Sequence, residues 1–150
     1  MIRFFLCQFG KTSYICNKFN CESMNNSKNK VSIAANTNAG TTEYRFNIDL
    51  YVFQSDGEYV AYCPSLDITE TGETYSQCLC CFYEKFQIYV EWCVEHGTLL
   101  DDLRKHGWKI LKTELKPPSY KIQMGTAEMK RLFDNNVNFE RIVSPMRIAL

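Results

Sequence analysis

Residues 44–97 read YRFNIDLYVFQSDGEYVAYCPSLDITETGETYSQCLCCFYEKFQIYVEWCVEHG, and this stretch decides the fold. Apolar and polar residues alternate over 43–53, which is typical of a strand with one buried face. Asp56-Gly57 supplies the positive φ angles of a hairpin turn, and a second strand is predicted over 58–63. A third short strand is predicted over 66–71. Together these strands form an antiparallel meander.

A long helix is predicted after the meander. Thr74 is a good N-cap, apolar residues recur at three- and four-residue steps, and Gly97 is suited to the C′ position that ends a helix near His96. A short second helix is expected over 99–106. A fourth strand is expected over 108–115, where the alternation returns, and it should rejoin the sheet.

The order β-β-β-α-(α)-β predicts an α+β domain over residues 43–116, with the long helix packed on one face of the meander. The same order describes the first half of a ribonuclease-H-like topology. Residues 1–42 end in an Asn- and Ser-rich run and are expected to be a weakly ordered leader, with Met24 as an alternative start. Residues 117–150 are expected to form a basic tail with a short helix over 126–133.

Charge is unevenly distributed, although the chain has 17 Lys+Arg and 17 Asp+Glu. Residues 43–110 carry five basic and twelve acidic side chains, a balance of −7, while the segments before and after carry +4 and +3. An acidic body attracts a basic protein and repels nucleic acid. Acids that only keep the domain solvated explain the pattern equally well.

The eight cysteines indicate neither a disulfide framework nor a metal site. The N-terminus lacks the apolar run of a secretory signal, so the thiols are expected to be reduced and the protein cytoplasmic. Cys78, Cys80 and Cys81 fan around the predicted helix, which argues against a knuckle-type zinc site, and buried free cysteine packs as a small hydrophobe. No run approaches the roughly 20 apolar residues needed to span a bilayer, so no membrane association is expected.

Catalysis is not expected. A ribonuclease H needs carboxylates that converge on two metal ions. Asp49 and Asp67 alternate with core residues, so both should point away from the core that the helix covers. The sequence contains no phosphate-binding glycine loop, nucleophile elbow or paired histidine ligands. We therefore predict no enzyme activity, no catalytic or metal-binding residue and no cofactor.

Aromatic residues on the outer face of the sheet are the better functional candidates. Tyr51, Phe53 and Tyr62 lie opposite the predicted core face, and aromatic side chains concentrate binding energy at interfaces. With Asp49 and Asp67 they form the candidate partner-binding site. The alternative is that the tail or the leader covers this face.

The segment DGEYVAYCPSLDITETGETYSQCLCCFYEKFQIYVE (56–91) resembles the HicB-like antitoxin family of bacterial type II toxin–antitoxin systems. The spacing from Asp56-Gly57 through Cys63-Pro64 to Thr71-Gly72-Glu73-Thr74 carries the resemblance, which extends over residues 44–115 with the flanking strands. It implies a degraded ribonuclease-H-like fold that is not an enzyme and that binds and masks a small basic HicA-type ribonuclease.

The resemblance also raises the question of DNA. Many members of the family bind promoter DNA through a C-terminal helix-turn-helix or ribbon-helix-helix. Residues 119–150 show no pair of well-formed helices, so the sequence leaves DNA binding open. The predicted function is that of an antitoxin; the alternative is a stand-alone regulatory or scaffold domain without a toxin partner, which could self-associate as a homo-oligomer through strand edges.

Overall fold

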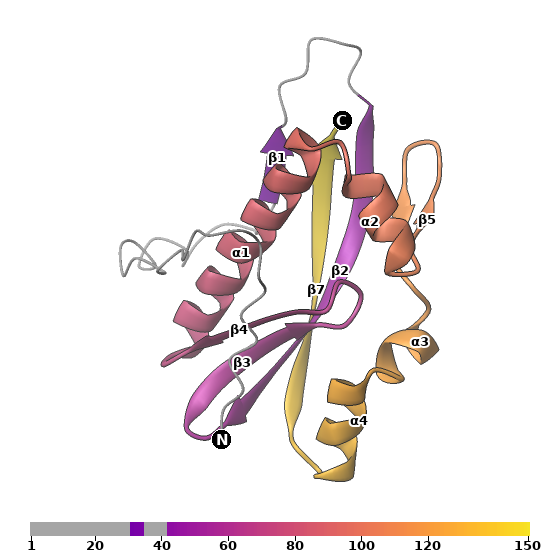
Figure 1. Cartoon of the computed structure of the whole chain (residues 1–150). Coiled ribbons are helices and arrows are strands. Elements are labelled where there is room, and N and C mark those ends of the chain that lie inside the picture. Colours follow the sequence, from indigo (N-terminus) through magenta and orange to yellow (C-terminus); the bar gives the residue numbers. More distant parts are fainter. Residues whose placement is uncertain (1–30, 35–41) are drawn as a thin grey trace.

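The computed structural model describes residues 31–34 and 42–150, with side chains described from residue 42 onward. Figure 1 shows a twisted sheet with the long helix α1 lying across it and shorter helices beside it. The elements of the described ranges follow in the order β1 (Val31–Ala34), β2 (Glu43–Ser55), β3 (Glu58–Cys63), β4 (Ile68–Gly72), α1 (Tyr75–Glu95), α2 (Leu99–Lys105), β5 (Lys109–Ile110), β6 (Leu115–Lys116), α3 (Tyr120–Met124), α4 (Ala127–Asp134) and β7 (Phe139–Ala149).

The main sheet has the strand order β1-β7-β2-β3-β4. β1 runs parallel to β7, and all other neighbours are antiparallel. The predicted α+β class and the β2–β3–β4 meander are therefore confirmed. The hairpin turn also forms as its sequence indicates, since Asp56 and Gly57 both adopt positive φ angles, 53° and 84°.

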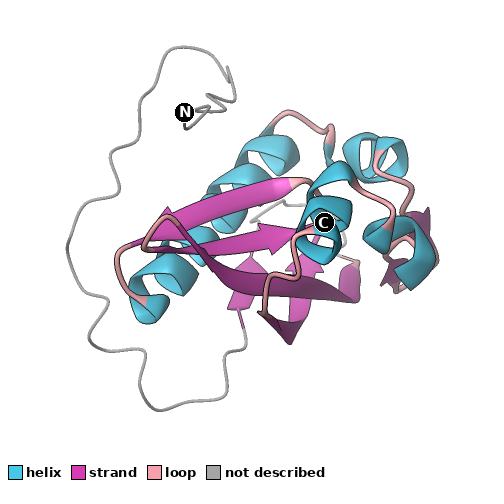
Figure 2. Cartoon of the chain, turned by 90° about the horizontal axis from the view of Figure 1, so that it is seen from below, coloured by secondary structure: helices cyan, strands magenta, loops and turns pink. Residues whose placement is uncertain are grey.

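The main core lies between α1 and the face of the sheet formed by even-numbered β2 residues. Ile48, Leu50 and Val52 are buried there against apolar side chains of α1 such as Phe82 and Phe86. Alternation along β2 and the three- and four-residue repeat of α1 produce this contact directly. Views along the sheet show helices on both of its sides (Figure 2).

The caps of α1 fix where the helix begins and ends. Thr74 Oγ1 accepts a hydrogen bond from the Gln77 N–H at 3.2 Å, and the Gln77 side chain accepts from the Glu73 N–H at 3.1 Å. Gly97 follows the helix with a φ of 65°, in the left-handed region that glycine tolerates. The predicted helix bounds are thus confirmed to within one residue.

The prediction that residues 108–115 form a fourth strand of the main sheet is wrong. This segment forms the short hairpin β5–β6, a separate two-stranded sheet that meets the main sheet through one isolated bridge, with the Arg45 N–H donating to the Thr113 carbonyl at 3.1 Å. Residues 111–114 are all exposed, so the segment buries too little to form a sheet strand. Only its ends, Trp108 and Leu115, are buried.

The strand that does return is β7, from the segment expected to be a tail. It pairs with β2 over the whole of Glu43–Phe53, so residues 117–150 belong to the domain. Even-numbered residues of β7 face the core, including Met146 and Ile148. Thr42 and Leu150 donate backbone hydrogen bonds to each other, so the even-numbered residues of β7 are the ones whose backbone groups point toward β2. The backbone nitrogen of the odd-numbered Pro145 points away from β2, so its missing N–H costs no hydrogen bond in this pairing.

The cysteines follow the expectation in part. Cys63, Cys78, Cys81 and Cys93 are buried and form no disulfide, so they pack as small hydrophobes. Cys80 is disulfide-bonded, which corrects the expectation that every thiol is reduced. The expectations for Cys7, Cys16, Cys21, Met24 and most of the leader lie outside the described residues. In the part of the chain that the structure describes, no helix is long and apolar enough to cross a membrane.

Candidate partner-binding surfaces

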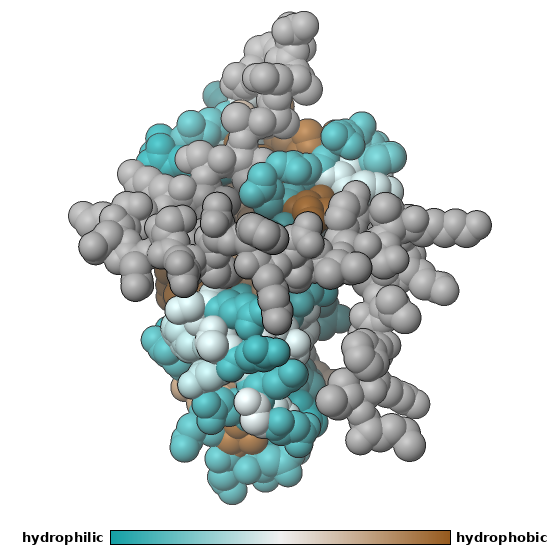
Figure 3. All heavy atoms as spheres, turned by 90° about the vertical axis from the view of Figure 1, so that its left-hand side faces the viewer, coloured by the Kyte–Doolittle hydropathy of each residue, from teal (hydrophilic) through white to brown (hydrophobic). Residues whose placement is uncertain are grey.

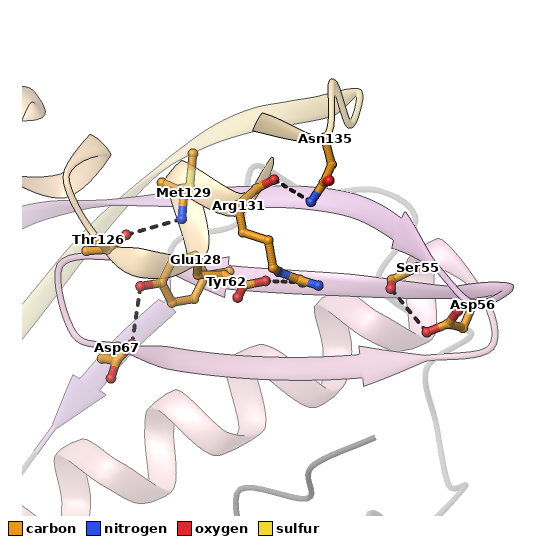
Figure 4. Close-up of polar contacts among 9 residues, drawn as sticks. All are labelled: Ser55, Asp56, Tyr62, Asp67, Thr126, Glu128, Met129, Arg131 and Asn135. Carbon is orange, nitrogen blue, oxygen red and sulfur yellow. Dashed lines mark hydrogen bonds and ion pairs between the residues drawn. The ribbon is translucent and has the colours of Figure 1, made fainter. Parts of the chain in front are cut away.

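The three aromatic residues of the candidate site are not exposed. Tyr51, Phe53 and Tyr62 retain 1%, 4% and 2% of their accessible surface, because Met129 and Leu132 of α4 pack on them. Figure 4 shows α4 on one side of the β2–β3 hairpin and a longer helix on the other. The expected exposed aromatic face is therefore wrong, and the alternative, that the C-terminal segment covers it, is confirmed.

Polar contacts hold α4 and the neighbouring turn in place. Thr126 caps α4 by accepting from the Met129 N–H, and the Asn135 side chain donates to the Arg131 carbonyl at 2.9 Å (Figure 4). Tyr62 OH, beneath the helix, donates to Asp67 Oδ1 at 3.2 Å. Burial raises the pKa of Tyr62 to about 12, and Asp67 adds to the increase. Tyr62 is therefore a neutral donor at physiological pH.

Asp67 lies in the turn before β4 rather than within a strand. Its φ of 54° is left-handed, a conformation that aspartate tolerates better than most residues. The side chain is exposed and its carboxylate accepts the Tyr62 bond. Of the five candidate residues, Asp67 is the one whose carboxylate is most available to a partner.

Asp49 is partly buried and paired within the chain. Arg141 of β7 donates to Asp49 Oδ1 from both Nε and Nη2, at 3.2 and 3.0 Å. The same guanidinium lies 5.7 Å from the centre of the Tyr120 ring. Because Arg141 neutralises it, Asp49 contributes little to an acidic binding surface.

Tyr51 lies beside this ion pair with an unsatisfied hydroxyl, to which no described residue hydrogen-bonds. Burial raises the pKa of Tyr51 to about 12, and the negative charge of Asp49 adds to the increase. An unpaired buried hydroxyl costs about 1–3 kcal/mol. The hydroxyl thus destabilises the fold in which it is buried.

Replacing Tyr51 with Phe is therefore expected to raise the free energy of unfolding by up to about 1 kcal/mol at pH 8. In the wild type, the unfolded tyrosine ionises near pH 10 and the folded one near pH 12, so stability should fall as the pH rises through this window. The Tyr51→Phe variant should lose less of its unfolding free energy over the same pH range, because it has no hydroxyl at this position. Urea unfolding at pH 8 and pH 11 measures both effects.

The matched control is Tyr83→Phe. Tyr83 OH lies 2.5 Å from the buried Ser144 Oγ, so removal of this hydroxyl breaks a bond between α1 and β7. We expect a loss of about 1 kcal/mol at pH 8. Equal losses in the two variants would show that Tyr51 OH has a partner after all.

A stripe on the outer side of α1 combines acids with apolar side chains. Glu84, Ile88, Glu91 and Glu95 recur at i, i+4, i+7 and i+11, so they share one face of the helix, and Trp92 adjoins them. Ile88 and Trp92 are 42% and 43% exposed. We call these five residues the α1 stripe. From the sequence alone, these acids cannot be distinguished from a solvated helix face.

The basic residue of α1 is engaged by β4. Lys85 is the one basic residue in the helix, and its ammonium is bound to Glu70 Oε1 at 2.6 Å and to the Thr69 carbonyl at 2.9 Å. Lys85 thereby blunts the outer edge of β4 against pairing with another strand. Figure 3 shows the side of the molecule that faces left in Figure 1, where the described residues are mostly hydrophilic with small hydrophobic patches.

A hollow of about 510 Å³ lies elsewhere, at the other end of α1. It is bordered by the first residue of α1, the end of β2, the start of β3 and the start of β7. The residues that give it chemical character are Gln54, Tyr59, Tyr75, Asn138, Phe139 and Glu140. Its volume is in the range of ligand-binding sites.

The carboxylates of strands β2 and β4, Asp49 and Glu70, lie on different sides of the sheet. Asp49 is on the outer face with Arg141, whereas Glu70 is bound to Lys85 on the side covered by α1. Among the described residues, no group of three His, Cys, Asp or Glu could hold a metal ion. The arrangement is one of separate ion pairs.

The structure is thus an α+β protein whose sheet is covered by α1 on one face and by α4 on the other, with the α1 stripe and the hollow on its surface. Comparisons with protein-family models, with curated proteins and with solved structures found no match. The resemblance to HicB-like antitoxins consequently enters only the proposal that follows.

Proposed function

We propose that this chain is the antitoxin of a type II toxin–antitoxin pair and that it binds and masks a small basic ribonuclease of the HicA type. The observation that carries the proposal is the α1 stripe, which combines three acids with an exposed isoleucine and tryptophan. The resemblance of residues 44–115 to the HicB-like family supplies the class of partner. The chain itself acts without catalysis, in the cytoplasm.

The α1 stripe fits a basic protein for two physical reasons. Its carboxylates attract positive charge over about a Debye length, which speeds the encounter with a cationic partner. Exposed Trp92 and Ile88 then bury apolar area, and tryptophan is among the residues that most often dominate binding energy. Acids alone would give a solvated face; the apolar side chains among them favour an interface.

Charge reversal of the α1 stripe tests the proposal. In Glu91→Lys/Glu95→Lys we expect affinity for the product of a short basic reading frame adjacent to the gene to fall at least about 100-fold, from like-charge repulsion at the interface. Titration calorimetry measures the affinity, and co-expression measures whether growth is restored. The wild type should restore growth and the variant should fail.

Glu58→Lys/Asp134→Lys is the matched control, since it changes the net charge by the same amount away from α1. It should retain affinity within about threefold at physiological salt. Equal losses in both variants would mean that overall charge, and not the α1 stripe, binds the partner. A wild-type chain that neither binds the neighbour nor restores growth would refute the antitoxin proposal.

A stand-alone scaffold domain is the second candidate. The observation that favours it is a group of apolar side chains on the opposite side of the sheet, Tyr120, Ile122 and Val143, all more than half exposed. Such side chains suit self-association. A wild-type chain that sediments as a dimer and binds no basic neighbour would support this candidate over the antitoxin.

A further inference from the structure

The hollow beside the start of α1 has two tyrosine rings on the side of the sheet that α1 covers, Tyr59 from β3 and Tyr75 from α1. Phe139 of β7 borders the hollow, but its ring packs on Tyr51 and Phe133 on the other side of the sheet. The Tyr59 and Tyr75 rings meet edge to face, with centroids 5.8 Å apart and an interplanar angle of 87°. A cation is attracted to the face of an aromatic ring and not to its positive edge, and both tyrosines are only partly buried, so ring surface remains open to the hollow.

The charge of the hollow is negative. Glu140 is its one ionised side chain, and none of the described residues that line it is basic. Tyr75 OH donates to Glu140 Oε2 at 2.9 Å, which fixes the carboxylate at the rim, and no described residue bonds to Oε1. Burial raises the pKa of Tyr75 to about 12, and Glu140 adds to the increase, so the tyrosine stays neutral and donates.

The N-terminus of α1 is close and would oppose a cation, because the helix dipole is positive there. Thr74 and Gln77 already accept hydrogen bonds from backbone N–H groups of this end, which reduces that effect. The side-chain amides of Gln54 and Asn138 add carbonyl oxygens at the rim. Together, these groups favour the binding of a cation in the hollow.

The free carboxylate oxygen selects between the two cationic side chains. A guanidinium binds a carboxylate best through both oxygens, and Tyr75 already occupies one of them. An ammonium is a compact point charge that needs a single oxygen and the ring faces. Lysine therefore fits this site better than arginine.

We propose that the hollow of Tyr59, Tyr75 and Glu140 binds the side-chain ammonium of a lysine on the basic protein partner. This inference rests on the proposed function, and it adds a second contact point at the end of α1 opposite Glu95. The two sites together would let the partner lie along the helix.

Titration with two small probes tests the site directly. N-acetyl-lysine methylamide is expected to shift the NMR signals of the Tyr59 and Tyr75 rings with a millimolar dissociation constant. N-acetyl-norleucine methylamide, which lacks the ammonium, should bind at least about tenfold more weakly. Glu140→Gln should remove most of the lysine preference. Equal binding of the two probes, or absence of any shift with lysine, would overturn the proposal.

A second measurement separates this inference from the function on which it rests. Glu140→Gln should lower the affinity for the basic neighbour about tenfold, with Glu114→Gln, at an exposed position outside the hollow, as the control. If the neighbour binds the wild type and Glu140→Gln equally, the hollow is not a contact and the antitoxin proposal stands. If the lysine probe binds but the neighbour does not, the site stands and the antitoxin proposal fails.

Discussion

A chain that ends at Asn138 is expected not to fold, because it lacks β7. This strand pairs with β2 along eleven residues, from Phe139 opposite Phe53 to Ala149 opposite Glu43. It also buries Met146 and Ile148, and each such side chain contributes about 1.5–3 kcal/mol. Small domains are stable by about 5–15 kcal/mol, so the loss of these side chains and of the backbone pairing exceeds what the remainder can sustain.

Circular dichroism and proton NMR of the 1–138 chain measure the effect. We expect loss of the near-ultraviolet signal and collapse of the amide dispersion, with exposed apolar surface that binds a hydrophobic dye. A synthetic peptide of residues 139–150, added in trans, should restore the native signals. A cooperative thermal transition in the 1–138 chain without peptide would show that β7 is dispensable, as a tail would be.

The same strand shows where sequence reasoning succeeded and where it failed. The meander, α1 and its caps follow from local patterns that tertiary structure did not override. β7 was missed because its residues read FERIVSPMRIA, in which Pro145 and the charged residues break the apolar run. Pro145 is compatible with a strand only because its backbone nitrogen points away from β2. The direction of that nitrogen depends on how the two strands pair, and the local sequence does not reveal it.

The segment over 108–115 failed for the converse reason. It alternates locally, but its middle residues, 111–114, are all exposed, so it gains little burial by joining the sheet. β3 pairs with the second edge of β2 only over residues 51–55, and the segment uses the rest of that edge for a single bridge at Arg45. Local alternation is therefore a necessary condition for a strand and not a sufficient one.

The candidate site illustrates a related limit. Alternation placed Tyr51 and Phe53 on the outer face correctly, but it could not say whether a helix covers that face. The signal was present in α4, whose Met129 and Leu132 lie three residues apart and need an apolar surface to cover. Matching an amphipathic helix in the C-terminal segment to an unpaired aromatic face would have found the contact.

Gly72→Ala is expected to lower the free energy of unfolding by about 3 kcal/mol, which is the upper end of the usual cost of overpacking. Gly72 is buried at the end of β4, directly beneath the first turns of α1. A Cβ on this residue would lie 2.5 Å from the Cys78 backbone nitrogen and 2.8 Å from its Cα. Backbone atoms cannot rotate away as a side chain can, so α1 would have to move off the sheet.

Urea unfolding of Gly72→Ala measures this cost, and Gly125→Ala is the control. A Cβ at Gly125 would lie 3.2 Å from the Ile122 carbonyl oxygen, on an exposed residue that follows the short helix α3, where small shifts relieve the contact. The control should change stability by less than about 1 kcal/mol. If both variants were equally stable, α1 would be free to shift on β4, and the glycine within the Thr71-Gly72-Glu73-Thr74 motif would serve the turn alone. A large loss only at Gly72 would instead mean that this position requires glycine so that the helix can approach the strand.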